Sequence, residues 1–485
     1  MPPHPRRRSA TAVASYERGR TRDQRLKGHS VTASVNIGPI SGFPEWLPEV
    51  RILEQTLIDR IRRAYELFGF APIETPAAER LEVLTSKGGM ERQMYSLGRP
   101  AEDGADAVTS LGLHFDLTVP LARYVASHAE ELVFPFRRYQ IQKVWRGERA
   151  QRGRFREFYQ CDVDIVGDGS LAVAYDAEMP CVINSAFGAI GVGEFRVHVS
   201  NRKILSGLFG AFGIEGEQVA EALRLVDKYG MSDRPRLAAA LQEHGCEPKL
   251  VDRVLDVLPA GTVEEAMGLL EGFDAAREGA TELRDVLDRA VQLGMPAERL
   301  VADFSIARGL DYYTGTVYET FVAGNQDWGS VCSGGRYDDL TLALSGRAYP
   351  GVGISIGLTR LLYLLIQSRT LQPGARTPAV VLVTMQDAER YFDDYLALGH
   401  RLRGSGIPTE VYMQPDALRD QITYAVRKGF PLALIAGSRE FDDSAVTLRD
   451  LRERSQETVR ISDLIPSVTE RVGPPGTFLK RARHG

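Results

Sequence analysis

Acidic and amide side chains follow an arginine-rich segment near residue 150, a combination that suits a phosphate group beside a cationic ligand. The stretch RYQIQKVWRGERAQRGRFRE supplies the arginines, among them Arg146, and FYQCDVDIVG then places Gln160, Asp162 and Asp164 at every second position. In a β-strand these three side chains share one face, and the apolar residues between them share the other. A polar strand face costs free energy unless it lines a cavity. The pattern therefore predicts a ligand cavity, and the alternative is a solvated β-ribbon.

Two further stretches carry residues that could complete such a cavity. In LHFDLTVPLARY, Asp116 and Thr118 alternate with apolar residues, which predicts a strand with both side chains on one face. The alternative for this stretch is a polar edge strand. In RGLDYYTG, Arg308 could act as a fixed cation at the cavity mouth, because a planar guanidinium meets two phosphate oxygens at once. The alternative there is a β-turn, with Tyr312 and Tyr313 as strand aromatics.

Two stretches that contain glycine add to the same pattern. SGGRYDD carries Gly334 and Gly335, which let the backbone approach a ligand closely. We expect a turn-rich hairpin there and no phosphate loop, because no Gly-Lys-Ser/Thr sequence follows. In GISIGLTRL, Arg360 opens a predicted helix directly after a strand. Arg146, Arg308 and Arg360 are thus expected to converge with the acids on one antiparallel sheet, where they would suit a polyphosphate and a small cationic or amphoteric ligand.

Hydrophobic periodicity indicates the elements that position these residues. Leu53, Leu57 and Ile61 recur at helical spacing, which predicts an amphipathic helix over residues 49–70 with a short strand after it. Strands are expected within 107–167, and helices rich in Ala, Leu and Glu fill residues 200–298. Strand character returns after residue 298. Beyond the linker-like QPGARTP, strands and helices alternate, which predicts a small α/β domain with a largely parallel sheet.

These elements predict an α+β protein of several domains, because 485 residues exceed one hydrophobic core. We expect a disordered basic extension (1–41), a sheet domain in two parts (42–199 and 299–371) around a helical insertion (200–298), a C-terminal α/β domain (379–465) and a flexible tail (466–485). The extension is either a disordered tail or a targeting segment. Its Arg and Ser content favours a transit peptide, whereas Glu17 and Asp23 argue against one.

Composition limits the partners of the chain. No apolar run is long enough to span a bilayer, so no membrane partner is expected. The four cysteines are far apart and form no C-x-x-C pair, which argues against a zinc site or disulfides and fits a reducing cytosol. A net charge of −5 does not indicate a nucleic-acid-binding protein. A local basic patch such as residues 137–156 is nevertheless sufficient for phosphate contacts.

Taken together, the motifs resemble those of the histidyl-tRNA synthetase family of class II aminoacyl-tRNA synthetases. VWRGERAQRGRFREFYQCDVDIVG resembles motif 2, PGVGISIGLTRL resembles motif 3, and the first helix with APIETP resembles motif 1, the dimer interface of the family. VADFSIARGLDYYTG and CSGGRYDDL resemble the two histidine signature peptides. The resemblance spans roughly residues 42–463. It implies a class II antiparallel-sheet catalytic domain with a helical insertion, followed by a C-terminal α/β anticodon-binding domain.

The resemblance implies a cytoplasmic, homodimeric enzyme that uses ATP and Mg²⁺ to activate L-histidine and then charges tRNA(His). It assigns catalytic roles to Arg308 and Arg146, and it assigns no protein residue to a metal. The residues that it assigns to ATP are Arg146, Glu148, Arg154, Phe158 and Arg360. The residues that it assigns to histidine are Asp116, Thr118, Gln160, Asp164, Tyr312 and Tyr313.

Two positions depart from the family pattern. His114 stands where an arginine is usual, and Thr359 replaces the glutamate of the motif 3 sequence Gly-Leu-Glu-Arg. Two other functions therefore stay open: a synthetase paralogue that regulates histidine biosynthesis without catalysis, and a duplicated synthetase for resistance or natural-product assembly. The C-terminal domain and the retained arginines favour the ligase over the regulator.

Overall fold

The computed structural model describes residues 36–86, 93–98, 110–149, 151, 153–307 and 312–473. The chain divides into two compact units, one formed by Pro39–Pro44 with Leu57–Thr370 and the other containing Glu45–Thr56 and the chain from Leu371. Most of the predicted basic extension, the end of the predicted tail and Arg308 lie outside the described residues. Among the described residues, no helix is both long and apolar enough to cross a membrane.

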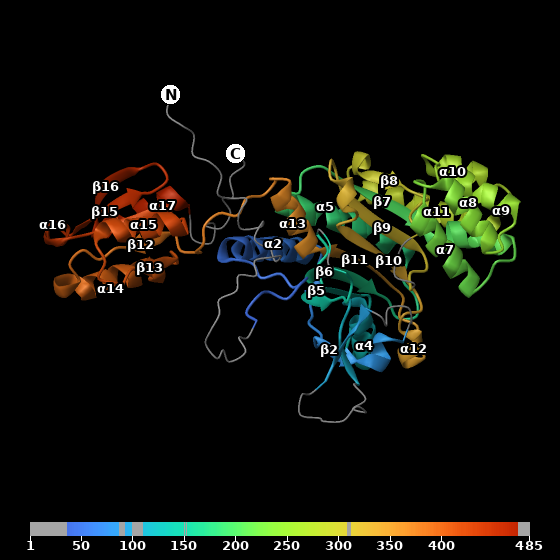
Figure 1. Ribbon diagram of the computed structural model, residues 1–485, viewed down its shortest axis with the longest axis horizontal. Helices are drawn as coiled ribbons and strands as arrows, with labels where there is room; N and C mark the ends of the chain where they lie inside the picture. The colour runs from blue at the N-terminus through green and yellow to red at the C-terminus, as the bar shows by residue number, and fades with distance from the viewer. Residues whose placement is uncertain are drawn as a thin grey trace, which may run out of the picture. The chain divides into compact units, whose positions relative to one another are not determined.

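The first unit is built on an eight-stranded sheet (Figure 1). Its inner pairings are antiparallel, and only the short edge strands β1 and β8 pair in parallel. This confirms the predicted antiparallel, α+β character. In spatial order the strands are β1 (Ala71–Pro72), β5 (Phe136–Trp145), β6 (Glu157–Val166), β11 (Gly351–Gly357), β10 (Cys332–Tyr337), β9 (Thr316–Val322), β7 (Phe195–Asn201) and β8 (Leu300–Ala302).

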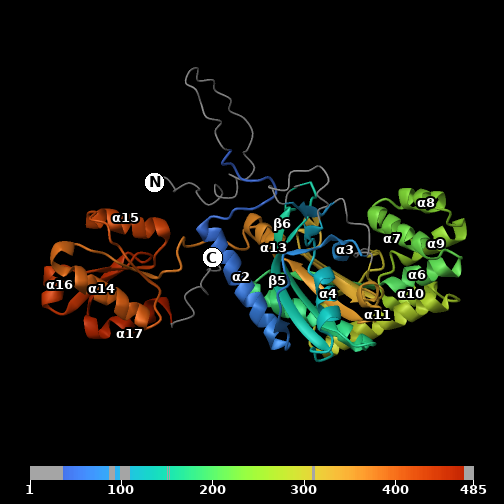
Figure 2. The ribbon, with the colours of Figure 1, turned by 90° about the horizontal axis from the view of Figure 1, so that it is seen from below.

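The two strands predicted from charge alternation pair as expected. β5 and β6 form an antiparallel ladder in which Arg138 lies opposite Asp164 and Gln140 lies opposite Asp162. The apolar face of β6 is covered by helix α2 (Pro48–Leu67), whose Tyr65 hydroxyl donates to the Cys161 carbonyl oxygen at 2.9 Å (Figure 2). Tyr65 and Cys161 are both fully buried. The polar face of β6 is therefore the face opposite α2.

The predicted strand around Asp116 is wrong. Only Leu111–Leu113 forms a strand, β4, which pairs with β2 (Ala78–Arg80) and β3 (Tyr95–Leu97) in a separate small sheet. Thr118 instead begins helix α4 (Thr118–His128), in which residues 119–122 and Val125 are buried. Alternation over a few residues could not distinguish a short strand from the start of a helix.

The predicted turn-rich hairpin at SGGRYDD is also wrong, because this segment is β10, an inner strand of the sheet. Gly334 is required by the close approach of the neighbouring strand: a Cβ atom there would lie 2.1 Å from the Gly353 carbonyl oxygen. A Cβ atom at Gly335 would lie 2.8 Å from the Tyr313 ring. Both glycines thus admit protein atoms, and Gly334 also lines the cavity described below.

Helices make up the predicted insertion, and they gather beside the β7 end of the sheet (Figure 1). The first of them begins directly after β7, where the Asn201 side chain caps the helix by accepting from the Lys203 backbone N–H. The helices are α6 (Arg202–Ala211), α7 (Glu217–Tyr229), α8 (Arg234–Glu243), α9 (Pro248–Val257), α10 (Val263–Leu269) and α11 (Asp274–Gln292). Two further helices, α5 (Glu178–Ile190) and α13 (Leu358–Gln367), pack on the sheet.

The C-terminal unit contains a five-stranded mixed sheet in the order β13 (Thr409–Val411), β12 (Val381–Val383), β14 (Leu432–Ile435), β15 (Ala445–Asp450) and β16 (Ser455–Arg460). The first three strands are parallel, and β15 and β16 form an antiparallel hairpin that the prediction of a largely parallel sheet missed. The exposed, polar sequence of β16 carries no hydrophobic alternation that would have revealed it.

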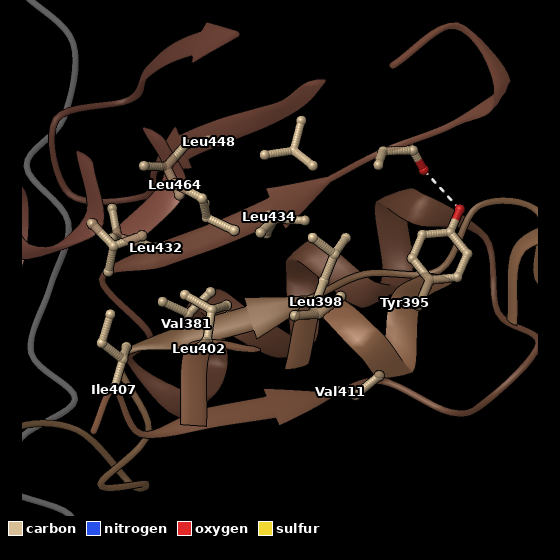
Figure 3. Close-up of a cluster of buried hydrophobic side chains, with 14 of the residues drawn as sticks. Val381, Tyr395, Leu398, Leu402, Ile407, Val411, Leu432, Leu434, Leu448 and Leu464 are labelled. Carbon is tan, nitrogen blue, oxygen red and sulfur yellow. Dashed lines mark hydrogen bonds between the residues drawn. The ribbon is translucent and has the colours of Figure 1, made fainter. Parts of the chain in front are cut away.

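Helices α14 (Ala388–Gly404), α15 (Leu418–Lys428) and α17 (Leu464–Val472) complete this unit. Figure 3 shows part of its core, where the Tyr395 hydroxyl donates to the Ala436 carbonyl oxygen at 2.7 Å. Val468 and Val472 of α17 belong to the same core. The unit therefore extends to Val472, beyond the predicted domain end at residue 465.

Candidate active site

A cavity of about 640 Å³ opens over the polar face of the large sheet. Its walls come from β6, β9, β10 and β11, from the beginnings of α4 and α13, and from the loop that connects β5 to β6. The predicted site residues that line it are Asp116, Thr118, Arg146, Glu148, Arg154, Phe158, Gln160, Tyr312, Tyr313 and Arg360. Segments almost 250 residues apart in sequence thus meet at one cavity.

Asp116 and Thr118 reach the cavity because a helix begins between the small and the large sheet. Asp116 accepts a hydrogen bond from the Val119 backbone N–H at 3.1 Å and so satisfies one free donor of the first turn of α4. Its other oxygen accepts from the Tyr312 hydroxyl at 3.2 Å. Burial raises the pKa of Asp116, and the charge of Arg146 opposes that rise. A cationic guest would be drawn to this carboxylate.

Gln160 connects the acidic side of the cavity with the arginines. Its amide nitrogen donates to the Ser355 hydroxyl at 2.5 Å, and its amide oxygen accepts from Arg146 Nη2 at 3.4 Å. Arg146 is held at its other end, where Nε donates to the Phe115 carbonyl oxygen at 3.0 Å. The Arg146 guanidinium also lies 5.2 Å from the centre of the Phe158 ring. These contacts fix a planar cation next to an aromatic face.

Asp164 lies behind the cavity wall and is not among the residues that line the cavity. Its Oδ2 pairs with Arg138 Nη2 at 2.5 Å, and its Oδ1 accepts from the Tyr337 hydroxyl at 2.9 Å. Gly353 makes room for this carboxylate, because a Cβ atom there would lie 2.1 Å from Asp164 Oδ1. Asp164 is therefore bound to protein groups, in contrast to the direct ligand contact that the sequence suggested.

A polar row crosses the sheet beneath the cavity. Strand register aligns Gln140, Asp162, Ser355, Ser333 and Glu319 on neighbouring strands. Ser333, Ser355 and Glu319 line the cavity, and the sequence analysis missed all three. They lie on three different strands, so register was needed to bring them together.

The loop between β5 and β6 places further cations at the cavity. Gly153 has φ +71°, which favours glycine, and a Cβ atom there would meet the Trp328 ring at 2.9 Å. The neighbouring Arg154 and the α13 residue Arg360 both line the cavity. Of the three arginines expected to converge, Arg146 and Arg360 thus share this cavity, and Arg308 is outside the described residues.

The two departures from the family pattern have structural partners. The Thr359 hydroxyl accepts from the Tyr159 backbone N–H at 2.9 Å and thereby ties the start of α13 to β6. The buried His114 ring contacts the Lys143 carbonyl oxygen through Nε2 at 2.8 Å and lies 5.5 Å from the Trp145 ring. Burial lowers the pKa of His114, which favours a neutral ring. Neither residue lines the cavity.

The carboxylates of the cavity do not form a preorganised metal cage. Across the described ranges, no group of three or more His, Cys, Asp or Glu side chains could hold a metal ion. Asp116, Glu148 and Glu319 line the cavity as separate carboxylates. This donor set fits Mg²⁺, which binds proteins through one or two carboxylates and completes its coordination with substrate phosphates and water.

Comparisons with known proteins agree with this geometry. The family model of histidyl-tRNA synthetase matches residues 42–361, and that of the anticodon-binding domain matches residues 379–471. A curated histidine–tRNA ligase from Xanthomonas axonopodis pv. citri is 44% identical over 448 residues, which cover 87% of this chain and 94% of the relative.

Solved structures show the same relationship. Histidyl-tRNA synthetase from Nostoc sp. is 37% identical with a TM-score of 0.81, and the match covers 90% of this chain and all of that one. A protein from Bacillus halodurans described as an ATP phosphoribosyltransferase regulatory subunit/histidyl-tRNA synthetase is 22% identical with a TM-score of 0.66, over 81% and 97% of the two chains, and shares the fold. The chain belongs to the histidyl-tRNA synthetase family.

Proposed function

We propose that this cavity is where the chain, an aminoacyl-tRNA ligase of the histidine family, joins L-histidine to AMP before transfer to tRNA(His). The observation that carries the proposal is that Arg146 and Arg360 share one cavity with Asp116 and Gln160. A site with cations on one side and an acid and an amide on the other can hold a polyphosphate and an amino acid at once.

The arginines are proposed to bind ATP. Arg146, fixed by Phe115 and Gln160, would hold the α-phosphate and the substrate carboxylate. Arg154 and Arg360 would hold the outer phosphates, Glu148 would contact the adenine, and Phe158 would stack on it. Mg²⁺ would arrive with the phosphates and neutralise part of their charge. Arg308 would stand at the α-phosphate by family resemblance.

The acid and the amide are proposed to bind histidine. Asp116, Thr118 and Gln160 would hold the ammonium group, since they line the cavity and Asp116 carries a buried carboxylate. Tyr313 and Tyr312 would face the imidazole ring, and Asp164 would act on it from behind the wall. A buried site that hydrogen-bonds imidazole rejects apolar amino acids strongly, because its own polar groups would be left unpaired.

This arrangement can support adenylate formation without a protein nucleophile. A histidine carboxylate oxygen attacks the α-phosphorus, the bond from that phosphorus to the β-phosphate oxygen breaks, and pyrophosphate leaves. The protein contributes in-line positioning and positive charge around the phosphorus, where negative charge accumulates. In the second step, a terminal ribose hydroxyl of the tRNA attacks the histidyl carbonyl carbon and AMP leaves.

The tRNA partner is proposed from the matched anticodon-binding domain, and the homodimer from the resemblance of the first helix to motif 1. The C-terminal unit is proposed to bind the anticodon stem of tRNA(His), and the segment around α2 is proposed to form a homodimer interface. The four cysteines are all buried and free, which fits a reducing compartment such as the cytoplasm.

The rival functions differ in measurable ways. A regulatory paralogue would bind histidine without exchange, and the matched anticodon-binding domain argues against it. A duplicated synthetase would keep the chemistry and change the preferred amino acid. We therefore propose to measure ATP–pyrophosphate exchange with a panel of amino acids, followed by charging of a tRNA(His) transcript. Exchange that depends on histidine supports the ligase, and its absence in the folded protein contradicts it.

Two variants assign the sides of the cavity. Asp116→Asn is expected to raise KM for histidine by about tenfold or more with little change in KM for ATP, because it removes a charge-assisted contact to the ammonium group. Arg360→Met is expected to raise KM for ATP with little change in KM for histidine. If each variant raised KM for histidine and KM for ATP by the same factor, the assignment of one side of the cavity to histidine and the other to ATP would be contradicted. Arg308→Ala is expected to abolish exchange in a folded protein.

A further inference from the structure

Among the described residues, Asp162 is a buried acid that forms no ion pair of its own. It lies at the centre of β6, opposite Gln140 on β5 and Ser355 on β11, and it is 2% exposed. The nearby Arg138 is already paired at 2.5 Å with Asp164. A buried carboxylate without a full counter-charge is expensive in its ionised form.

The groups around Asp162 come from every element that packs against it. Those that raise its pKa by charge are Asp164 and Asp116, whereas Arg138 and the Ser355 hydroxyl lower it. The other titratable groups that interact with it are Tyr65 of α2, Cys332 of β10, and Tyr312 and Tyr313 before β9. All four of these are neutral near pH 7, since burial raises each of their pKa values. Within the described ranges, the charged groups that act on Asp162 are therefore one arginine and two further acids.

Asp162 also connects directly to the cavity wall. Gln160 Nε2 lies 3.5 Å from Asp162 Oδ1 and 2.5 Å from Ser355 Oγ, and Gln160 Oε1 accepts from Arg146. An ionised Asp162 accepts hydrogen bonds only, so it holds the Gln160 amide with its nitrogen inward and its oxygen toward Arg146. A protonated Asp162 would instead present a donor to the same neighbours. Asp162 and Arg146 thus act together on the orientation of a residue that lines the cavity.

We propose that Asp162 is a positioning residue that gives up a proton when the ammonium group of the amino-acid substrate enters the cavity. The substrate cation takes over the charge compensation that the proton supplies in the free enzyme. No bond other than the carboxyl O–H is broken, and the proton passes to solvent or buffer. The inference rests on the proposed function, since it needs an amino acid bound beside Asp116 and Gln160.

The expected size of the effect follows from linkage. Burial raises the pKa of Asp162 to about 7, so about half of the free protein carries this proton at pH 7. If the ionised form binds the ammonium group, the apparent affinity scales with the ionised fraction and falls about tenfold from pH 8 to pH 6. A substrate that binds both forms equally would show neither proton release nor this pH dependence.

Titration calorimetry of the full-length protein tests the inference. Histidine is titrated at pH 7 in two buffers of different ionisation enthalpy, which yields the number of protons released per site. Because the imidazole ring of histidine also titrates near pH 7, the same measurement is made with triazolylalanine, a histidine isostere whose ring stays neutral from pH 6 to pH 8. The wild type is expected to release about half a proton with this probe.

The matched variants are Asp162→Asn and Asp168→Asn. Asp162→Asn keeps the size and the acceptor oxygen and removes the titration, so release should vanish and the affinity should stay equally weak at pH 6 and pH 8. Asp168 is a surface acid paired with Arg347 outside the cavity, and its variant should behave like the wild type. A purely structural role for Asp162 would weaken binding without flattening the pH profile.

The outcomes separate the two proposals. If neither histidine nor its isostere binds the folded protein, the proposed function fails. If they bind and the wild type releases no proton to the buffer, or if Asp162→Asn still releases one, the role of Asp162 is refuted and the proposed function stands. The wild-type measurement decides the question even if Asp162→Asn does not fold.

Discussion

Arg138 and Asp164 form an ion pair at 2.5 Å in which both side chains are removed from water, with 0% and 4% of their side-chain surface exposed. Arg138 also donates to Gln140 Oε1 at 3.3 Å, and Asp164 accepts from the Tyr337 hydroxyl. The pair lies directly beneath the polar wall of the cavity. The pair therefore places two compensating charges behind that wall, and neither residue lines the cavity.

Replacing Arg138 should be costly, because the Asp164 carboxylate would be left buried and uncompensated. Arg138→Met is expected to lower the free energy of unfolding by about 3–5 kcal/mol, measured by urea denaturation. The control is Arg347→Met, which breaks an ion pair whose side chains are 60% and 38% exposed and should cost at most about 1 kcal/mol. The double variant Arg138→Met/Asp164→Asn should recover much of the loss. Similar losses for the two single variants would contradict this account.

The hydroxyl of Thr359 performs a structural task at the start of α13. Thr359→Val keeps the shape of the side chain and removes the acceptor for the Tyr159 backbone N–H, so it is expected to cost about 1–3 kcal/mol and to raise KM for ATP through the adjacent Arg360. Thr359→Ser keeps the acceptor and should restore KM. Thr447→Val removes an exposed hydroxyl pair with Thr458 and should change stability by less than about 0.5 kcal/mol. If KM for ATP is unchanged in Thr359→Val, the hydrogen bond between Thr359 and Tyr159 does not affect nucleotide binding.

Part of the large sheet could be predicted, because two of its long strands carry regular alternation of polar and apolar residues. The β5–β6 hairpin is the example: Arg138, Gln140 and Gln142 alternate as regularly as their partners on β6. Asp116 was predicted to reach the cavity from a strand, but it does so from the beginning of a helix, where it accepts a hydrogen bond from the Val119 backbone N–H. Over so few residues, tertiary packing decides between a strand and a helix.

The position of Asp164 could not be predicted for a related reason. Sequence spacing showed which face of β6 it occupies, but not that Arg138 and Tyr337 would take both of its oxygens. Ser333, Ser355 and Glu319 were missed because they lie on different strands and meet only where the register aligns those strands. Side-chain partners across a sheet depend on that register, which local sequence does not specify.

The contribution of Asp162 to stability should fall as pH rises from about 4 to 7, in the direction opposite to ordinary acid denaturation. Burial raises the pKa of Asp162 from 3.8 to about 7, so the folded protein binds more protons than the unfolded chain between these values. Because the unfolded state binds fewer protons there, the free energy of unfolding decreases with pH. Burial raises the pKa values of Asp116 and Asp164 in the same direction.

Asp162→Asn isolates this contribution. The variant should gain stability relative to the wild type by a few kcal/mol between pH 4 and pH 8, with most of the change complete at pH 7. Parallel urea denaturation series of the two proteins across this range measure the difference. A difference that is constant with pH would show that Asp162 keeps an ordinary pKa in the folded protein.

Deleting residues 379–485 should separate the two half-reactions. Every residue that lines the cavity lies between Leu84 and Arg360, so the shortened protein should retain histidine-dependent pyrophosphate exchange. The main hydrophobic core of the deleted part consists of residues between Val380 and Val472. Charging of the tRNA(His) transcript should fall far more than exchange, because the deleted part matches the anticodon-binding domain.

The deleted segment, produced separately, should show cooperative unfolding by circular dichroism. Equal loss of exchange and charging in a folded, shortened protein would mean that the C-terminal unit supports the catalytic cavity itself.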